Sequence, residues 1–175
     1  MMKQLLVACS VSLSLTAAAS AQVPAGGEFR VNSYTTGRQS DARPGMEADG
    51  DFIVVWESNA QDGSGYGVFG QRFAASGAPR GSEFRINAYT TGAQWQPAVT
   101  MGSRGDFVVV WASQDGSGMS IQGRRYDTAG NPIGGEFLVD TLPTGFQTYP
   151  RIGRASDGRF VVSWTSDSID GSGAI

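Results

Sequence analysis

The stretch DFIVVW at residues 51–56 decides the fold of this 175-residue chain, because it occurs three times. It returns as DFVVVW at 106–111 and as RFVVSW at 159–164, at offsets of 55 and 53 residues. Successive side chains of a strand point to opposite faces, so an unbroken apolar run such as FIVVW needs both faces of its strand buried. Such a strand, repeated about every 54 residues, predicts an array of stacked units and not a single globular domain.

Each copy of this stretch is surrounded by further segments that also repeat. Every unit predicts four short strands with Gly-containing turns between them. In order, these are an inner strand, the apolar strand, a third strand that ends in Arg-Phe or Arg-Tyr, and an alternating outer strand. The repeated motifs are GGEFRVN (26–32, with variants at 81–87 and 134–140) and DGSG (62–65, then 115–118 and 170–173).

These units predict an all-β fold of four-stranded antiparallel blades, as in a β-propeller. The expected boundaries are 22–80 for the first repeat, 81–133 for the second and 134–175 for the third, which is truncated before its third strand. About 2.7 repeats are fewer than the roughly four to eight blades of a closed propeller. We therefore expect a fragment of a longer protein, with further repeats of the same chain or other copies completing a ring. The alternating segment 28–32 is then an outer strand without a blade of its own, which suits pairing with the last blade.

Residues 1–21, MMKQLLVACSVSLSLTAAASA, have the three parts of a cleaved secretory signal. One Lys precedes an apolar stretch, and the small residues 19–21 form a cleavage site. The apolar stretch is too short for a membrane span, and too few residues precede Cys9 for a lipoprotein signal. We expect an exported protein that is extracellular, on the cell surface or periplasmic, without membrane attachment after cleavage.

The composition excludes several classes of chemistry. The chain contains no His, and its single Cys and single Lys both lie in residues 1–21. Residues 22–175 therefore have no Ser-His-Asp triad, no imidazole metal ligand, no disulfide and no lysine Schiff base. The formal net charge of −3 argues against nucleic acid as a partner.

The repeated pattern also resembles a known group of proteins. The run GxEFxVNxYTTGxQ, followed by DFVVVWxS and QDGSG, is similar to repeats of bacterial secreted and surface proteins that look like β-propeller blades. The resemblance covers nearly all of residues 26–173. It implies a place in a large adhesin-like or calcium-binding exoprotein, and such arrays carry no single assigned activity.

From the repetition we expect a non-catalytic extracellular module, not an enzyme, that serves adhesion or binds a glycan or a protein. Similar copies in every blade suit a scaffold better than one asymmetric active site. A first alternative is part of a secreted propeller-type hydrolase or lyase. That would need paired carboxylates at a central pocket, and no pair among the 16 acidic residues stands out. A second alternative is a structural spacer in a large surface protein.

The Asp of the DGSG turn is the main candidate for a metal ligand. Asp62, Asp115 and Asp170 occupy this turn in the three copies. Ca²⁺ takes about six to eight oxygen ligands, whereas each turn supplies one carboxylate. We therefore expect these side chains to cap their own turns, and no cofactor to be required. The acidic hairpin at 47–51, where Arg104 replaces an acid in the second copy, is expected to be solvated.

The aromatic residues divide into a core set and one exception. A Phe and a Trp stand near the ends of the apolar strand in every copy, which predicts core packing and not a carbohydrate-stacking surface. Trp95 is different, because its equivalents are Ser40 and Thr148 and the repeat needs no aromatic side chain there. We therefore expect Trp95 to contact a ligand. The core set is Phe52, Trp56, Phe107, Trp111, Phe160 and Trp164.

Overall fold

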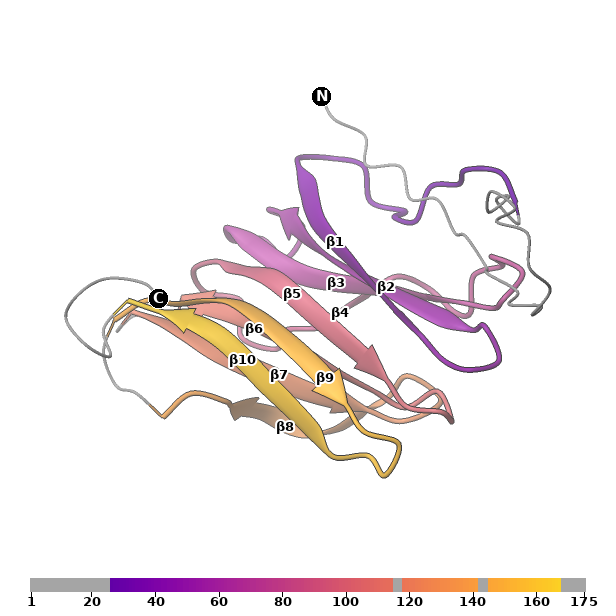
Figure 1. The fold of residues 1–175 in the computed structure, drawn as a ribbon. Coiled ribbons are helices and arrows are strands. Elements are labelled where there is room, and N and C mark those ends of the chain that lie inside the picture. Colours follow the sequence, from indigo (N-terminus) through magenta and orange to yellow (C-terminus); the bar gives the residue numbers. More distant parts are fainter. Residues whose placement is uncertain (1–25, 115–117, 142–144, 168–175) are drawn as a thin grey trace, which may run out of the picture.

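Ten strands and no helix make up the part of the chain that the computed structural model describes, which is residues 26–114, 118–141 and 145–167. The strands form two four-stranded sheets and one two-stranded sheet, which stack side by side (Figure 1). Within these residues there is no helix long and apolar enough to cross a membrane. The strands are β1 (Gln39–Met46), β2 (Phe52–Asn59), β3 (Tyr66–Phe73), β4 (Phe84–Arg85), β5 (Gln94–Met101), β6 (Phe107–Gln114), β7 (Met119–Tyr126), β8 (Pro132–Leu138), β9 (Gln147–Arg154) and β10 (Phe160–Ser166).

Each sheet is antiparallel and follows the chain order. The first sheet has the order β1-β2-β3-β4, the second β5-β6-β7-β8, and the third pairs β9 with β10. The first strands of the sheets are the inner ones, since β1 contacts β5 and β5 contacts β9. The prediction of all-β, propeller-like blades in an incomplete array is confirmed, and the described sheets do not close into a barrel. The predicted signal segment 1–21 lies outside the described residues.

The second strand of each sheet explains why the sheets stack. Ile53 and Val55 of β2 join a buried cluster with Phe107, Val109 and Trp111 of β6, so one face of the first sheet packs on the second. The opposite face of β6 packs in the same way against the third sheet. Burial of each large apolar side chain contributes roughly 1.5–3 kcal/mol. The stacked faces therefore supply most of the packing between blades.

The repeated Phe and Trp residues lie in this packing. Trp56 and Trp111 have only 2% and 1% of their surfaces exposed, and the Phe residues of the same two strands are also buried. Their equivalents in the third sheet, Phe160 and Trp164, are half-buried, because only two strands of that sheet fall within the described residues.

Tyr126 shows how tightly the first two sheets meet. Its ring stacks on Phe107 with a centroid distance of 4.6 Å, and its hydroxyl donates to the backbone carbonyl of Ile86, in the first blade, at 3.0 Å. Burial raises the pKa of Tyr126 to about 12. The raised pKa therefore keeps the phenol protonated, and this bond between the blades in place, into the alkaline range.

Candidate functional site

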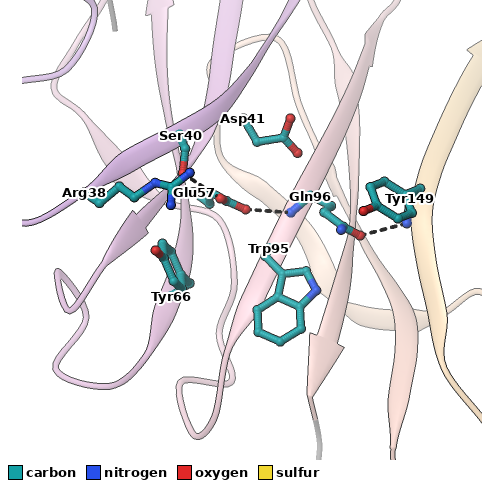
Figure 2. A pocket seen from close by; sticks show the side chains of 8 residues that line it. All are labelled: Arg38, Ser40, Asp41, Glu57, Tyr66, Trp95, Gln96 and Tyr149. Atoms are coloured by element: carbon teal, nitrogen blue, oxygen red, sulfur yellow. Dashed lines mark hydrogen bonds between the residues drawn. The ribbon is translucent and has the colours of Figure 1, made fainter. Parts of the chain in front are cut away.

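A pocket of about 460 Å³ opens at the inner strands and reaches all three sheets. Its volume lies in the range of small-molecule sites. Its lining combines three aromatic side chains with two carboxylates, a guanidinium, a hydroxyl and an amide (Figure 2). The lining residues are Arg38, Ser40, Asp41, Glu57, Tyr66, Trp95, Gln96 and Tyr149.

All of these lining residues occupy positions at which the three repeats differ. Constant residues stand between them, including Gly37, Gln39 and Ser58, which recur in every copy. Each lining residue therefore stands at a variable position next to constant ones, which form a frame. The variable sets are Arg38, Ala93 and Phe146; Ser40, Trp95 and Thr148; Asp41, Gln96 and Tyr149; Glu57, Ala112 and Thr165; and Tyr66, Met119 and Ala174.

A β-bulge in each inner strand turns one side chain toward the pocket. The pairing of β1 with β2 changes register between Ser40 and Arg43, and the change recurs in the second and third sheets. At the bulge, Asp41, Gln96 and Tyr149 have φ angles of 52°, 53° and 52°. Left-handed backbone at a residue other than Gly costs roughly 1–3 kcal/mol, and it is concentrated at functional sites. The same strained conformation occurs in all three blades, and it therefore marks this level of the sheets as a candidate functional site.

A glutamine amide fixes the start of the inner strand in the first and second sheets. Gln94 is fully buried, accepts a hydrogen bond from Asn87 Nδ2 at 3.0 Å, and donates to the Thr91 carbonyl at 3.1 Å. Gln39 makes the equivalent bond to a loop carbonyl in the first sheet. Because Gln94 immediately precedes Trp95, the frame holds the pocket side chains in position.

Two carboxylates, Asp41 and Glu57, belong to the same pocket although they lie on different strands (Figure 2). Both oxygens of Glu57 are bound: Oε1 accepts from the Ser40 hydroxyl at 2.7 Å, and Oε2 accepts from the backbone N–H of Gln96 at 3.1 Å. Asp41 is held differently, by an ion pair between its Oδ1 and Arg43. Glu57 therefore joins the first sheet to the second, whereas Asp41 is oriented from within its own strand.

The bulge residues show why Glu57 matters to Asp41. In the second sheet, the bulge side chain of Gln96 accepts the backbone N–H of Tyr149 in the third sheet at 2.8 Å. In the first sheet, the matching contact to the N–H of Gln96 comes from Glu57 and not from the bulge residue. Position 57 is an acid, whereas the other copies have Ala and Thr there. Because Glu57 makes this structural contact, the side chain of Asp41 does not make it.

Three aromatic side chains complete the lining. Trp95 packs with one side against the core between the second and third sheets. Tyr149 is 56% exposed, and Tyr66 starts β3 on the opposite side of the pocket (Figure 2). Aromatic faces with a few polar groups are the usual lining of small-molecule sites. A sugar ring, with C–H surfaces and hydroxyl edges, matches that chemistry.

Trp95, the residue expected to contact a ligand, lines the pocket. That it contacts a ligand stays a prediction. Sequence reasoning misses Asp41 and Glu57, because it weighs acidic residues by their spacing along the chain. The signal that singles out Trp95 is a residue unlike its two equivalents. The same comparison marks both acids.

The DGSG turn is described in the first repeat only. Asp62 Oδ1 accepts the N–H of Ser64 at 3.2 Å, and its Oδ2 accepts from Asn87 at 3.3 Å, which is the geometry of a residue that caps its own turn. Asp115 and Asp170 lie outside the described residues. The calcium alternative at these turns stays a prediction.

The acidic hairpin between β1 and β2 brings oxygens of Glu47, Asp49 and Asp51 within 4.8 Å of one another. Asp51 already accepts the N–H of Ala75 at 2.9 Å and pairs with Arg80. Burial, and after it the charge of Asp49, raises the pKa of Glu47. Because protein groups already satisfy Asp51, we assign no site to this cluster.

No protein-family model matches the chain, and no curated protein matches it in sequence. Solved structures match it in three dimensions. An endo-arabinase from Bacteroides thetaiotaomicron VPI-5482 superposes with a TM-score of 0.55 at 10% identity, over 87% of this chain and 59% of that one. What it shares with this chain is the fold. An endo-1,4-beta-xylanase from the same organism gives a TM-score of 0.51 at 11% identity, over 78% and 52% of the two chains. An alpha-L-arabinofuranosidase from Lactobacillus brevis gives 0.51 at 10% identity, over 80% and 49%.

These matches correct the functional expectation. All three structures are glycoside hydrolases, so the expectation of a non-catalytic module that is not an enzyme is wrong, and the hydrolase alternative is favoured. The argument from repetition fails because copies of one scaffold still leave room for an asymmetric site where the copies differ. The chain spans between 49% and 59% of the length of these structures.

Proposed function

We propose that this chain is part of a propeller-type glycoside hydrolase and that the pocket at the inner strands binds its polysaccharide substrate. One observation carries the proposal: two carboxylates and three aromatic side chains line a single pocket at the level where the repeats differ. Glycosidases cleave the bond between two sugars with a pair of carboxyl groups that flank it. The fold shared with three enzymes of this kind supports the same conclusion.

Hydrolysis requires two carboxyl groups with different roles, and Asp41 and Glu57 supply them. One carboxyl group gives a proton to the leaving sugar oxygen, while the other activates a water molecule or attacks the sugar carbon. Glu57 is fixed by two hydrogen bonds and Asp41 by Arg43, so neither group needs to be ordered when the substrate binds. Arg38 adds a guanidinium with donors for sugar hydroxyls.

The substrate class that we propose is a polysaccharide rich in arabinose or xylose, because the similar structures are named for arabinan- and xylan-type activities. Such a substrate requires an exported enzyme, since a polysaccharide stays outside the cell. The signal-like segment 1–21 and the resemblance to repeats of secreted proteins are consistent with export. Further repeats that complete a ring of blades are the partner that we propose.

The purified chain is expected to release reducing ends from arabinan or xylan, and a heat-denatured sample is expected to release none. The Asp49→Asn variant is the charge-matched control, because Asp49 lies on a hairpin outside the pocket. It is expected to keep the rate of the parent chain. A folded chain that releases no reducing ends from a panel of plant polysaccharides contradicts the proposed function.

A further inference from the structure

One charged side chain of the pocket has no partner among the residues that the structure describes. Arg38 lines the pocket and is exposed, and within this part of the chain its guanidinium makes no hydrogen bond, ion pair or ring contact. The two carboxylates of the pocket are held by other groups, since Asp41 pairs with Arg43 and Glu57 accepts two hydrogen bonds. The donors of the Arg38 guanidinium are therefore available to a ligand.

The scaffold fixes the backbone at this position and does not require a cation there. The carbonyl of Arg38 accepts the N–H of Asn59 at 2.8 Å, and the carbonyl of Ala93 accepts the N–H of Gln114 at 2.9 Å. In the third sheet, the carbonyl of Phe146 makes the same kind of contact. Because Ala and Phe occupy the equivalent places, the guanidinium is not part of the repeated fold.

The position of Arg38 places it beside polar and aromatic groups of the first sheet. It immediately precedes β1 and stands two residues before Ser40, which lies opposite Glu57 in the pairing of β1 with β2. On the other side, the strand partner of Tyr66 is Asn59, whose N–H binds the Arg38 carbonyl. Figure 2 shows Arg38 between Ser40 and Tyr66. The first sheet therefore lines one side of the pocket with a guanidinium, a hydroxyl and an aromatic ring.

The charges of the pocket leave room for one further negative group. Asp41 and Arg43 neutralise each other, and both oxygens of Glu57 accept hydrogen bonds from neighbouring groups of the protein. A guanidinium presents its N–H donors in a planar fork, which gives two parallel hydrogen bonds to the two oxygens of a carboxylate. A sugar hydroxyl has a single oxygen and cannot match that fork. A sugar that carries a carboxylate therefore suits Arg38 better than a neutral one.

We propose that Arg38 binds the carboxylate of a uronic acid residue in the substrate, so that the pocket selects acidic polysaccharides that contain arabinose or xylose. This inference rests on the proposed function and states which polymers of that class are preferred. Arg38 acts here as a specificity residue and takes no part in cleaving the bond. The formal net charge of the chain is −3, so general attraction does not explain a preference for an acidic polymer, and a local cation is required.

Polymers that differ only in the carboxylate test this proposal. A glucuronoxylan and an arabinan that carries galacturonic acid are each compared with a carboxyl-reduced form, in which every acid has become a primary alcohol. For the polymer that it cleaves, the parent chain is expected to have a kcat/KM at least about tenfold higher on the acidic form. Added salt is expected to lower this ratio, because the guanidinium is exposed.

The Arg38→Gln variant is expected to lose the preference, with a ratio of the two kcat/KM values within about twofold of one. It is expected to fold, which circular dichroism checks, because Ala93 and Phe146 fill the same place in the other repeats. Arg38→Lys keeps the charge without the planar fork, so an intermediate ratio is expected. Arg104→Gln is the charge-matched control. Arg104 is exposed on the hairpin that follows β5, outside the pocket lining, and this variant is expected to keep the ratio of the parent.

Affinity electrophoresis in gels that contain the same polymers measures binding separately from hydrolysis. The acidic form is expected to retard the parent more than the reduced form does, and Arg38→Gln is expected to lose this difference. Equal retardation of the parent by the two forms overturns the proposal, and so does a preference that persists unchanged in Arg38→Gln. A parent chain that shows the Arg38-dependent retardation but releases no reducing ends supports the carboxylate site and contradicts the proposed hydrolase.

Discussion

The Trp111→Ala variant is expected to unfold with a free energy about 3–5 kcal/mol lower than that of the parent chain. Trp111 is 1% exposed and lies in the cluster that joins the first and second sheets. Loss of the indole leaves a cavity between two sheets whose backbones are fixed by pairing on both sides, so the gap cannot close. Denaturant titration followed by circular dichroism measures the change.

The Trp95→Ala variant is the matched control for this prediction. It removes the same side chain from a half-buried pocket position, and we expect it to cost less than half as much as Trp111→Ala. Equal losses for the two variants would contradict the assignment of Trp111 to the core between blades. A loss for Trp111→Ala of less than about 1 kcal/mol would contradict it as well.

The Asp41→Asn and Glu57→Gln variants are each expected to lower kcat/KM on arabinan or xylan by about 10²–10⁴-fold, the usual contribution of a catalytic acid or base. Both changes remove charge and keep shape. Gln at position 57 can still accept the N–H of Gln96 with its oxygen and donate to the Ser40 hydroxyl with its amide. We therefore expect the free energy of unfolding to change little.

The Glu57→Ala variant tests the structural role of Glu57 separately from its catalytic role. It reproduces Ala112 of the second repeat and leaves the Ser40 hydroxyl and the Gln96 N–H without their acceptor. It is expected to lose both activity and about 1–3 kcal/mol of stability. If Asp41→Asn or Glu57→Gln keeps activity within about threefold of the parent, the pair is not the catalytic pair.

The strand order could be predicted from the sequence because the signals are local. The apolar FIVVW run needs both of its faces covered, and Gly turns separate it from its neighbours. Trp56 and Trp111 could be placed in the core by the same logic, since they recur with the strand. In each case, residues close by in the sequence determine the strand and its burial.

The pocket could not be predicted in this way, because its geometry depends on conformations without a local signature. Asp41 has a left-handed φ of 52° that nothing in its side chain demands, and the bulge that creates it shifts the register opposite Glu57. The contact from Glu57 to Gln96 crosses between sheets that are separate in sequence. The differences between the repeats, taken position by position, are the sequence signal that indicates the pocket residues.

Tryptophan fluorescence during titration with arabino- and xylo-oligosaccharides tests the central claim most directly, because Trp95 lines the pocket, whereas Trp56 and Trp111 are buried and Trp164 does not belong to the lining. We predict a saturable change with one of these sugars. The Trp95→Phe variant is expected to lose that change while it still binds the sugar in calorimetry. A parent chain whose fluorescence and calorimetric heat do not respond to either sugar would contradict the claim that this pocket binds a polysaccharide. A response that persists unchanged in Trp95→Phe would place the sugar elsewhere.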